Sequence, residues 1–191
     1  MGPNDHWLLF RLRKGDKGAC RELVRRHHAG VYAYLRRLAR SSDLAEDLTQ
    51  ETYAQAWTHV RGLRQCASLR AWLLTIARNE YLQWLRRRRE EQGPTDGLEG
   101  RASPDPSAEK TLLASERAGR LRSAVSRLEP ELQECVSLHY FQDLSLREVS
   151  EVLAVPRGTV KSRLNRALGE LRAQIAEDRS HEQRRAGRAT A

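Results

Sequence analysis

Cysteines are scarce in this chain, and their placement argues against the sites that cysteine usually builds. Only Cys20, Cys66 and Cys135 occur among 191 residues, far apart and without any C-x-x-C spacing. An odd number of scattered cysteines disfavours both a disulfide framework and a zinc site. We therefore expect reduced, buried thiols in a cytoplasmic protein, with no bound metal and no cofactor.

Long apolar runs are also missing. No stretch of the sequence approaches the roughly 20 apolar residues that a membrane-spanning helix needs, and the N-terminus lacks the pattern of a signal peptide. These absences predict a cytoplasmic protein with no direct membrane insertion.

Alternating strand patterns and internal repeats are absent as well, and helical periodicity dominates, which predicts an all-α fold. Residues 5–89 and 111–175 are predicted to form two small helical domains. Between them, residues 90–110 are rich in glycine, proline, serine and acidic residues, which is typical of a flexible linker. Residues 176–191 have the composition of a frayed polar tail.

The charge of the chain is unevenly distributed. The net charge is +9, which suits a polyanionic partner such as nucleic acid. Residues 1–89 carry 18 Lys and Arg against 8 Asp and Glu, whereas residues 90–110 carry 2 against 6. The basic excess therefore lies mainly in the N-terminal domain.

One helix in this basic domain presents an acidic face. Ser41 or Ser42 can cap it, and one of its sides carries Leu44, Ala45, Leu48, Thr49, Thr52, Ala56 and Val60. The opposite side is an arc of about 140° in helical-wheel geometry, and it contains Asp43, Glu46, Asp47, Gln50 and Glu51. This face would repel DNA. It is either a binding surface for a basic protein partner or an ordinary solvated face.

The next segment, residues 61–89, combines a loop over 61–68 with an amphipathic helix. Trp72 and Trp84 belong to its apolar stripe, and aromatic residues at helical spacing are more often core than base-stacking groups. The polar side carries residue types that bind phosphates and base edges: Arg78, Asn79, Gln83, Arg86 and Arg87.

Residues 145–172 have the pattern of a helix-turn-helix. Ser145 and Glu148 form a capping-box pattern, Pro156 and Gly158 interrupt the apolar periodicity, and a second helix is expected from about Thr159. Such a motif places the outer face of its second helix in the DNA major groove; an ordinary helical hairpin with a solvated basic face is the alternative. That outer face contains Lys161, Ser162, Asn165, Arg166 and Gly169.

Together these segments resemble the extracytoplasmic-function (ECF, group IV) sigma factors of the sigma-70 family. DLAEDLTQETYAQAW, residues 43–57, is similar to region 2.2 of that family, and SLRAWLLTIARNEYLQWLRRRR, residues 68–89, to regions 2.3 and 2.4. LSLREVSEVLAVPRGTVKSRLNRALGELR, residues 144–172, is similar to region 4.2, and KGDKGACRELVRRHHAGVYAYLRRL to region 2.1. The blocks occur in the family's order.

The resemblance implies an alternative sigma factor that binds core RNA polymerase at the β′ clamp and the β flap, recognises promoter DNA and helps to melt it. The region 2.2 face, Asp43, Glu46, Asp47, Gln50 and Glu51, would dock on the clamp. The −10 element would be bound by Arg61, Arg64, Ser68, Arg78, Asn79, Gln83, Arg86 and Arg87. The −35 element would be read by Arg157, Thr159, Lys161, Ser162, Arg163, Asn165 and Arg166.

The resemblance further implies an acidic linker that threads the polymerase cleft, and a membrane-associated anti-sigma factor that holds the free protein inactive. Two positions depart from the family pattern: Gln83 stands where an aspartate is frequent, and Ala154 stands where the turn of region 4.2 often has glycine. Both departures bear on promoter sequence more than on family membership.

Two other functions are compatible with parts of the sequence. A stand-alone helix-turn-helix regulator would bind duplex DNA without polymerase, usually as a dimer, and would leave the acidic face unused. An enzyme acting on nucleic acid would need carboxylates or a metal beside the basic surface. The dense acidic group at residues 43–51 lacks His or Cys support, so we expect no catalytic site.

Overall fold

The computed structural model describes the backbone of residues 3–63, 68–92, 119, 121 and 123–189. These residues form helices and short connections and include no strand, which confirms the predicted all-α class. The contacts divide them into two compact units. Unit 1 contains the described residues up to 92 together with Arg147–Ala154, and unit 2 contains those within Asp105–Leu146 and Val155–Ala191.

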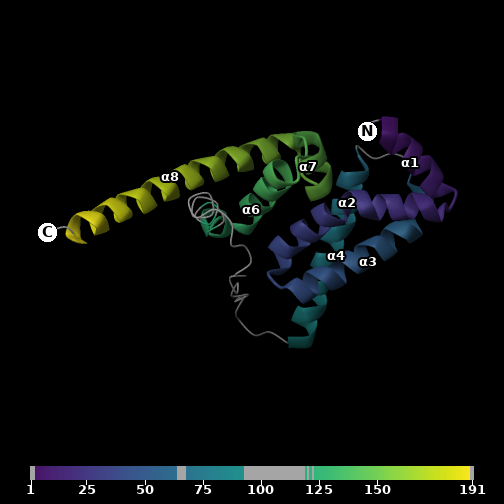
Figure 1. The fold of residues 1–191 in the computed structure, drawn as a ribbon, viewed down its shortest axis with the longest axis horizontal. Coiled ribbons are helices and arrows are strands. Elements are labelled where there is room, and N and C mark those ends of the chain that lie inside the picture. Colours follow the sequence, from purple (N-terminus) through teal and green to yellow (C-terminus); the bar gives the residue numbers. More distant parts are fainter. Residues whose placement is uncertain (1–2, 64–67, 93–118, 120, 122, 190–191) are drawn as a thin grey trace. The chain divides into compact units, whose positions relative to one another are not determined.

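Unit 1 is built mainly from three long helices (Figure 1). These are α2 (Lys17–Ala39), α3 (Ser42–His59) and α4 (Leu69–Gln92), accompanied by α1 (Pro3–Arg13), the 3₁₀ turn η1 (Val60–Gly62) and α7 (Leu146–Leu153). Helix α2 packs against both α3 and α4, and α1 packs against α2 and η1. Tyr34 and Leu35 of α2 and Leu73 and Leu74 of α4 are fully buried at the centre.

Helix α3 enters this core through a stripe of small residues. Ala45, Thr49, Thr52 and Ala56 are buried together with the larger Leu48, as the periodicity predicts. The Thr49 hydroxyl donates to the Ala45 carbonyl at 2.6 Å, and the Thr52 hydroxyl donates to the carbonyl of Leu48 at 2.6 Å. These bonds satisfy the buried hydroxyls within the helix itself. The opposite face of α3 is consequently left to solvent.

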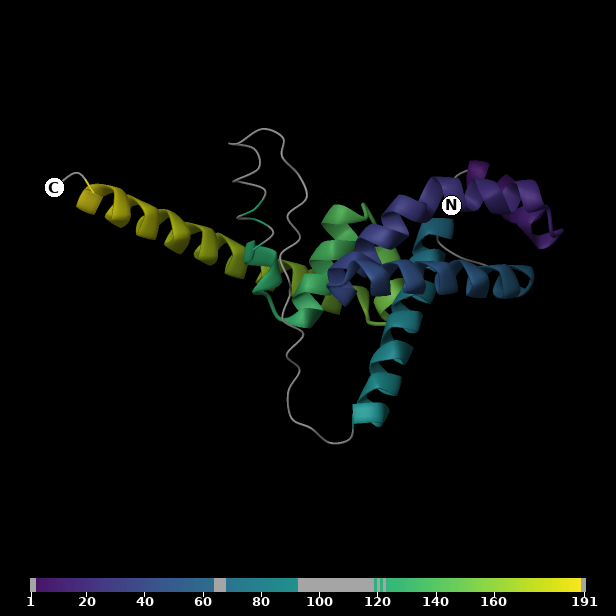
Figure 2. The same ribbon diagram turned by 60° about the horizontal axis from the view of Figure 1, so that its bottom comes forward.

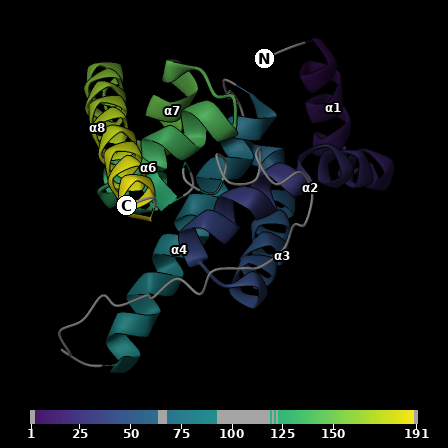
Figure 3. The same cartoon turned by 60° about the vertical axis from the view of Figure 1, so that its left-hand side comes forward.

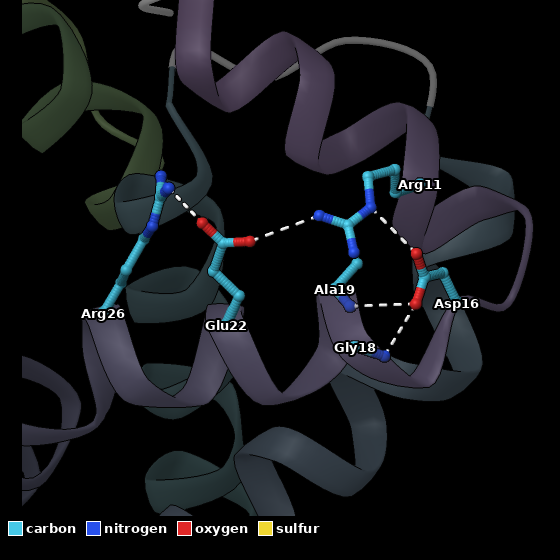
Figure 4. A network of polar contacts seen from close by, with 6 residues as sticks. All are labelled: Arg11, Asp16, Gly18, Ala19, Glu22 and Arg26. Carbon is cyan, nitrogen blue, oxygen red and sulfur yellow. Dashed lines mark hydrogen bonds and ion pairs between the residues drawn. The ribbon is translucent and has the colours of Figure 1, made fainter.

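A polar network fixes the junction between α1 and α2 (Figure 4). Asp16 caps α2 by accepting from two backbone N–H groups of its first turn, at 2.6 and 3.2 Å. The Arg11 guanidinium contacts Asp16 at 2.8 Å and Glu22 at 3.4 Å, and Glu22 also pairs with Arg26. The hydrogen bond from Arg11, followed by those from the backbone, lowers the pKa of the Asp16 carboxyl. Gly15, with φ of +76°, allows the sharp turn between α1 and α2, just before Asp16.

Unit 2 has a smaller core. Helix α6 (Pro130–Val136) continues into a π-helical turn, η2 (Ser137–Phe141), and packs against the long helix α8 (Arg157–Ala189). The buried side chains that α8 contributes are those predicted from its periodicity, Val160, Leu164, Ala167 and Leu171, whereas Leu168 is half-buried.

Several boundaries differ from the sequence expectations. Helix α8 begins at Arg157 and not at Thr159, because the Pro156 carbonyl already accepts the first helical bond, from the Val160 N–H at 3.1 Å. Gly158 therefore lies inside the helix. Helix α8 also continues to Ala189 where a frayed tail was expected, and α4 extends to Gln92, two residues beyond Glu90, where the linker was expected to begin. Both extensions are rich in Glu, Gln and Arg, which are good helix formers.

The turn after α7 carries a strained residue. Helix α7 begins at Leu146, directly after Ser145 as predicted, and ends at Leu153. Ala154 follows with φ of +55°, a left-handed conformation that glycine adopts without steric cost. The position where the family pattern often has glycine is thus the position where the backbone favours it.

We predict that Ala154→Gly stabilises the protein. Relief of the left-handed strain outweighs the added entropy of the unfolded chain, so the free energy of unfolding rises by about 0.5–1 kcal/mol. Urea unfolding followed by circular dichroism measures this change. Gly15→Ala is the matched control of opposite sign, because it places a Cβ on a residue with φ of +76°; destabilisation by both variants would contradict the interpretation.

Candidate protein and nucleic-acid interfaces

The acidic face predicted on α3 is present and fully outward. Its cap is Ser41, whose hydroxyl accepts from the Leu44 N–H at 3.4 Å. The Glu51 carboxylate accepts a hydrogen bond from Gln55 at 2.8 Å, one turn further along the helix. All five predicted side chains are exposed on the side opposite to the buried stripe: Asp43, Glu46, Asp47, Gln50 and Glu51.

Sequence reasoning missed an aromatic residue at the end of this face. Trp57 is 39% exposed and follows Gln50 by seven residues, which returns it to the same side of the helix. The spacing from Asp43 to Gln50 to Trp57 is the signal that could have revealed it. Exposed tryptophans beside polar groups are frequent anchors of protein interfaces.

A second missed residue is a buried acid on α4. Glu80 is 7% exposed, although it is charged at neutral pH in water. Burial raises the pKa of its carboxyl and the neighbouring charge of Glu51 raises it further, while Arg87 and His59 lower it. Glu80 follows Leu73 and Ala77 at helical spacing, so the apolar stripe itself pointed to its burial. Its carboxyl is near enough to α3 to interact electrostatically with Glu51 of the acidic face.

Two of the predicted −10 residues before α4 fall in the described chain, and their environments differ. Arg61 is exposed on η1. Ser68 is half-buried and caps α4, since its hydroxyl accepts from the Ala71 N–H at 3.1 Å and donates to Glu148 at 2.5 Å. Both bonds lie within unit 1. Arg64 lies outside the described residues.

The remaining candidates of this group lie on α4, whose C-terminal end projects beyond α2 and α3 (Figure 2). Asn79, Arg86 and Arg87 are exposed, whereas Arg78 and Gln83 are half-buried. The Gln83 amide oxygen accepts from Arg87 at 3.4 Å. The structure thus gathers amide and guanidinium groups on the outer side of one helix.

The tryptophans of α4 lie between core and surface. Trp72 and Trp84, for which a core role was preferred over base stacking, are both half-buried, so part of each ring lies against the core and part at the surface. The Trp84 ring stacks near Tyr81 with centroids 6.2 Å apart, and the Arg88 guanidinium lies 5.2 Å from its centroid. These contacts hold Trp84 along the helix surface because its neighbours on α4 cover part of the ring.

The outer face of α8 is arranged as predicted. Of the two further residues predicted in its first turn, Arg157 is exposed and Thr159 is half-buried. A Cβ built at Gly169 meets nothing within 4 Å, so the absence of a side chain there serves no packing need of the described residues. The exposed residues of the predicted face are Lys161, Ser162, Asn165, Arg166 and Gly169.

The two central arginines of α8 have different environments. Arg166 is exposed and pairs with Glu129 and Glu170, each at 2.9 Å. The hydrogen bond to Glu170 and the interactions with Glu129 raise the pKa of its guanidinium. Arg163 is half-buried, pairs with Glu131 of α6 and lies beside Cys135, whose thiol pKa is raised by burial. Arg163 therefore joins α8 to α6, whereas Arg166 is held at the surface by carboxylates that an anionic ligand can replace.

The described residues contain no group of three or more His, Cys, Asp or Glu side chains arranged to hold a metal ion. Among the same residues, no helix has the length and apolarity needed to cross a membrane.

Comparison with known families and proteins gives concordant matches. Residues 23–91 match Sigma-70 region 2, and residues 118–171 match Sigma-70, region 4. The ECF RNA polymerase sigma factor SigE of Mycolicibacterium smegmatis is 35% identical over 83% of this chain, which spans 62% of that relative. The ECF RNA polymerase sigma factor SigL of Mycobacterium tuberculosis is 32% identical over 82% of this chain and 89% of its own length.

Two solved structures share the fold. CnrH, in complex with the cytosolic domain of CnrY, aligns with a TM-score of 0.68 at 22% identity over 91% of this chain and 98% of its own. The sigma factor RpoE from Bartonella quintana, in complex with the anti-sigma factor NepR, aligns with a TM-score of 0.66 at 24% identity over 82% and 96%. The helical architecture, the two matched regions and the relatives agree: the chain belongs to the ECF family of RNA polymerase sigma factors.

Proposed function

We propose that this protein is an alternative sigma factor that binds core RNA polymerase, directs it to −10 and −35 promoter elements and promotes melting of the DNA. The observation that carries the proposal is the separation of charge on its helices. Unit 1 combines an exposed acidic face on α3 with exposed basic and amide groups on α4, and α8 of unit 2 carries a second basic face. A stand-alone DNA-binding protein has no use for the acidic face.

The three surfaces divide the work according to their charge. The carboxylates of α3 repel DNA and attract a basic protein surface, so we assign them to the β′ clamp of the polymerase. Asn79, Gln83, Arg86 and Arg87 of α4 offer base-edge and phosphate contacts to the −10 element. Helix α8 would read the −35 element in the major groove through Lys161, Asn165 and Arg166. Unit 2, which contains α8, would also bind the β flap.

An anti-sigma factor would control access to these surfaces. One similar solved structure, RpoE from Bartonella quintana, is bound to the anti-sigma factor NepR, and the other, CnrH, is bound to the cytosolic domain of CnrY. A membrane-associated inhibitor of this kind would hold the protein in the cytoplasm until a signal arrives. The protein would act there without a catalytic site of its own, because promoter opening uses binding energy and the polymerase performs the chemistry.

Run-off transcription with purified core polymerase and a pool of genomic fragments tests the proposal. Discrete transcripts that require the protein are expected, and their start sites locate both promoter elements. If no transcripts form and the free protein instead shifts a specific duplex, the stand-alone regulator is the correct function.

We predict that the paired charge reversal Asp47→Lys with Glu51→Lys weakens core binding by roughly tenfold or more, because two attractive contacts become repulsive. Fluorescence anisotropy with labelled protein measures the affinity, and circular dichroism checks the fold. The control Glu151→Lys reverses an exposed helical acid outside the face. Equal core affinity for the wild type and the paired variant would refute the assignment.

We predict that Arg166→Ala reduces discrimination at the −35 element by about tenfold while core binding persists, because one guanidinium–base contact is lost. Competition between matched and mismatched promoter duplexes measures the effect in the holoenzyme. Arg163→Ala is the informative comparison, because Arg163 is half-buried beside the buried Cys135, and its removal also takes packing away from unit 2. If Arg166→Ala loses both core binding and DNA discrimination, the variant is misfolded and the recognition role of Arg166 is contradicted.

A further inference from the structure

The outer face of α1 presents two unburied aromatic rings. Trp7 is 62% exposed and Phe10 is 47% exposed, although both belong to a helix whose other side is buried through Leu8, Leu9 and Leu12. The two rings stack on each other with centroids 5.7 Å apart and planes 19° from parallel. The packing of unit 1 therefore leaves both rings at the surface, where each covers part of the other and a large part of Trp7 faces solvent.

A cation completes this pair. The Lys14 ammonium lies 4.4 Å from the centroid of the Phe10 ring, and Lys14 is itself exposed. Ring faces that accept bases, together with a cation that accepts phosphate, are the combination with which proteins bind single-stranded nucleic acid. A docked protein segment would need a wider apolar surface than these two rings offer. The flanking residues Arg13 and Lys17 are exposed and basic, which favours an anionic ligand.

The ring pair lies on a helix that contacts the neighbourhood of Arg61, one of the residues assigned to the −10 element. Helix α1 packs against η1, which carries Arg61. A Cβ built on Gly15, the residue after Lys14, would lie 3.5 Å from the Arg61 nitrogen Nη2. Figure 3 shows α1 at the end of unit 1 opposite to the C-terminal end of α4. A DNA strand that follows α4 toward its N-terminus and passes Arg61 would next reach α1.

We propose that Trp7, Phe10 and Lys14 form a stacking platform for unpaired promoter bases adjacent to the −10 element. This inference rests on the proposed sigma-factor function and adds a contact to it. The rings would hold one or two bases of the melted strand and oppose their return to the duplex, while Lys14 would neutralise the phosphate between them. Helix α1 then contributes to the lifetime of the open complex and not to polymerase binding.

The test uses the holoenzyme on a promoter found by run-off transcription. The double variant Trp7→Leu with Phe10→Leu keeps the apolar surface but removes the ring faces. It should shorten the lifetime of the heparin-resistant open complex by about tenfold. The matched variant Trp7→Phe with Phe10→Tyr keeps both ring faces and should retain most of that lifetime. In the Lys14→Gln variant, the lifetime should fall less steeply with added salt than it does in the wild type, because one phosphate contact is missing.

A second readout locates the bases. 2-Aminopurine, placed singly along the melted strand of a premelted promoter, should be quenched at one or two positions by the wild type and not by the leucine variant. Equal lifetimes and equal quenching for both proteins would overturn the proposal. A loss of core affinity in the leucine variant, with opening unchanged at saturation, would overturn it in favour of a protein contact. If the wild-type holoenzyme opens no promoter, the proposed function fails and not the platform alone.

Discussion

The narrow buried stripe of α3 is the constraint on which the surfaces of unit 1 depend. Ala45, Leu48, Thr49, Thr52 and Ala56 are buried where α3 packs against α2 and α4, and the two threonines satisfy their hydroxyls within the helix. A helix that buries this side must expose the opposite one. The carboxylates of α3 are therefore outward as a consequence of packing, and their concentration in a basic unit is the reason why we propose this surface for a protein partner.

The same logic governs α8, with a difference in how its charges are held. Its apolar side packs in unit 2, and Arg166 on the outer side is paired with Glu129 and Glu170. Exposed ion pairs contribute little to stability because water solvates both partners well. They orient the guanidinium without preventing its exchange to a phosphate or a base. Arg163, half-buried against Glu131 and Cys135, is committed to the fold of the unit instead.

Periodicity predicted the exposed and buried faces better than it predicted the ends of the helices. The exposure of the acidic face of α3 and of the outer face of α8 was predicted correctly, because the constant rotation per residue of an α-helix determines which side chains share a face. The end of α4 at Gln92 and of α8 at Ala189 were not, since polar residues with high helix propensity resemble linker and tail residues in composition. Ser68 is predicted to contact DNA; in this structure its hydroxyl caps α4 and donates to Glu148, and the bond to Glu148, 80 residues further along the chain, is a contact that periodicity does not reveal.

The sequence by itself determined the fold class, the family and the sign of charge on each helical face, because these follow from local periodicity and from motifs in a fixed order. Tertiary structure decided which side chains remain available. It buried Glu80 near Glu51, gave Arg163 and Arg166 separate roles and strained Ala154. It also left Trp7 and Phe10 stacked in solvent beside Lys14. The exposure of a ring depends on what packs against its helix, and residues distant in sequence supply that packing.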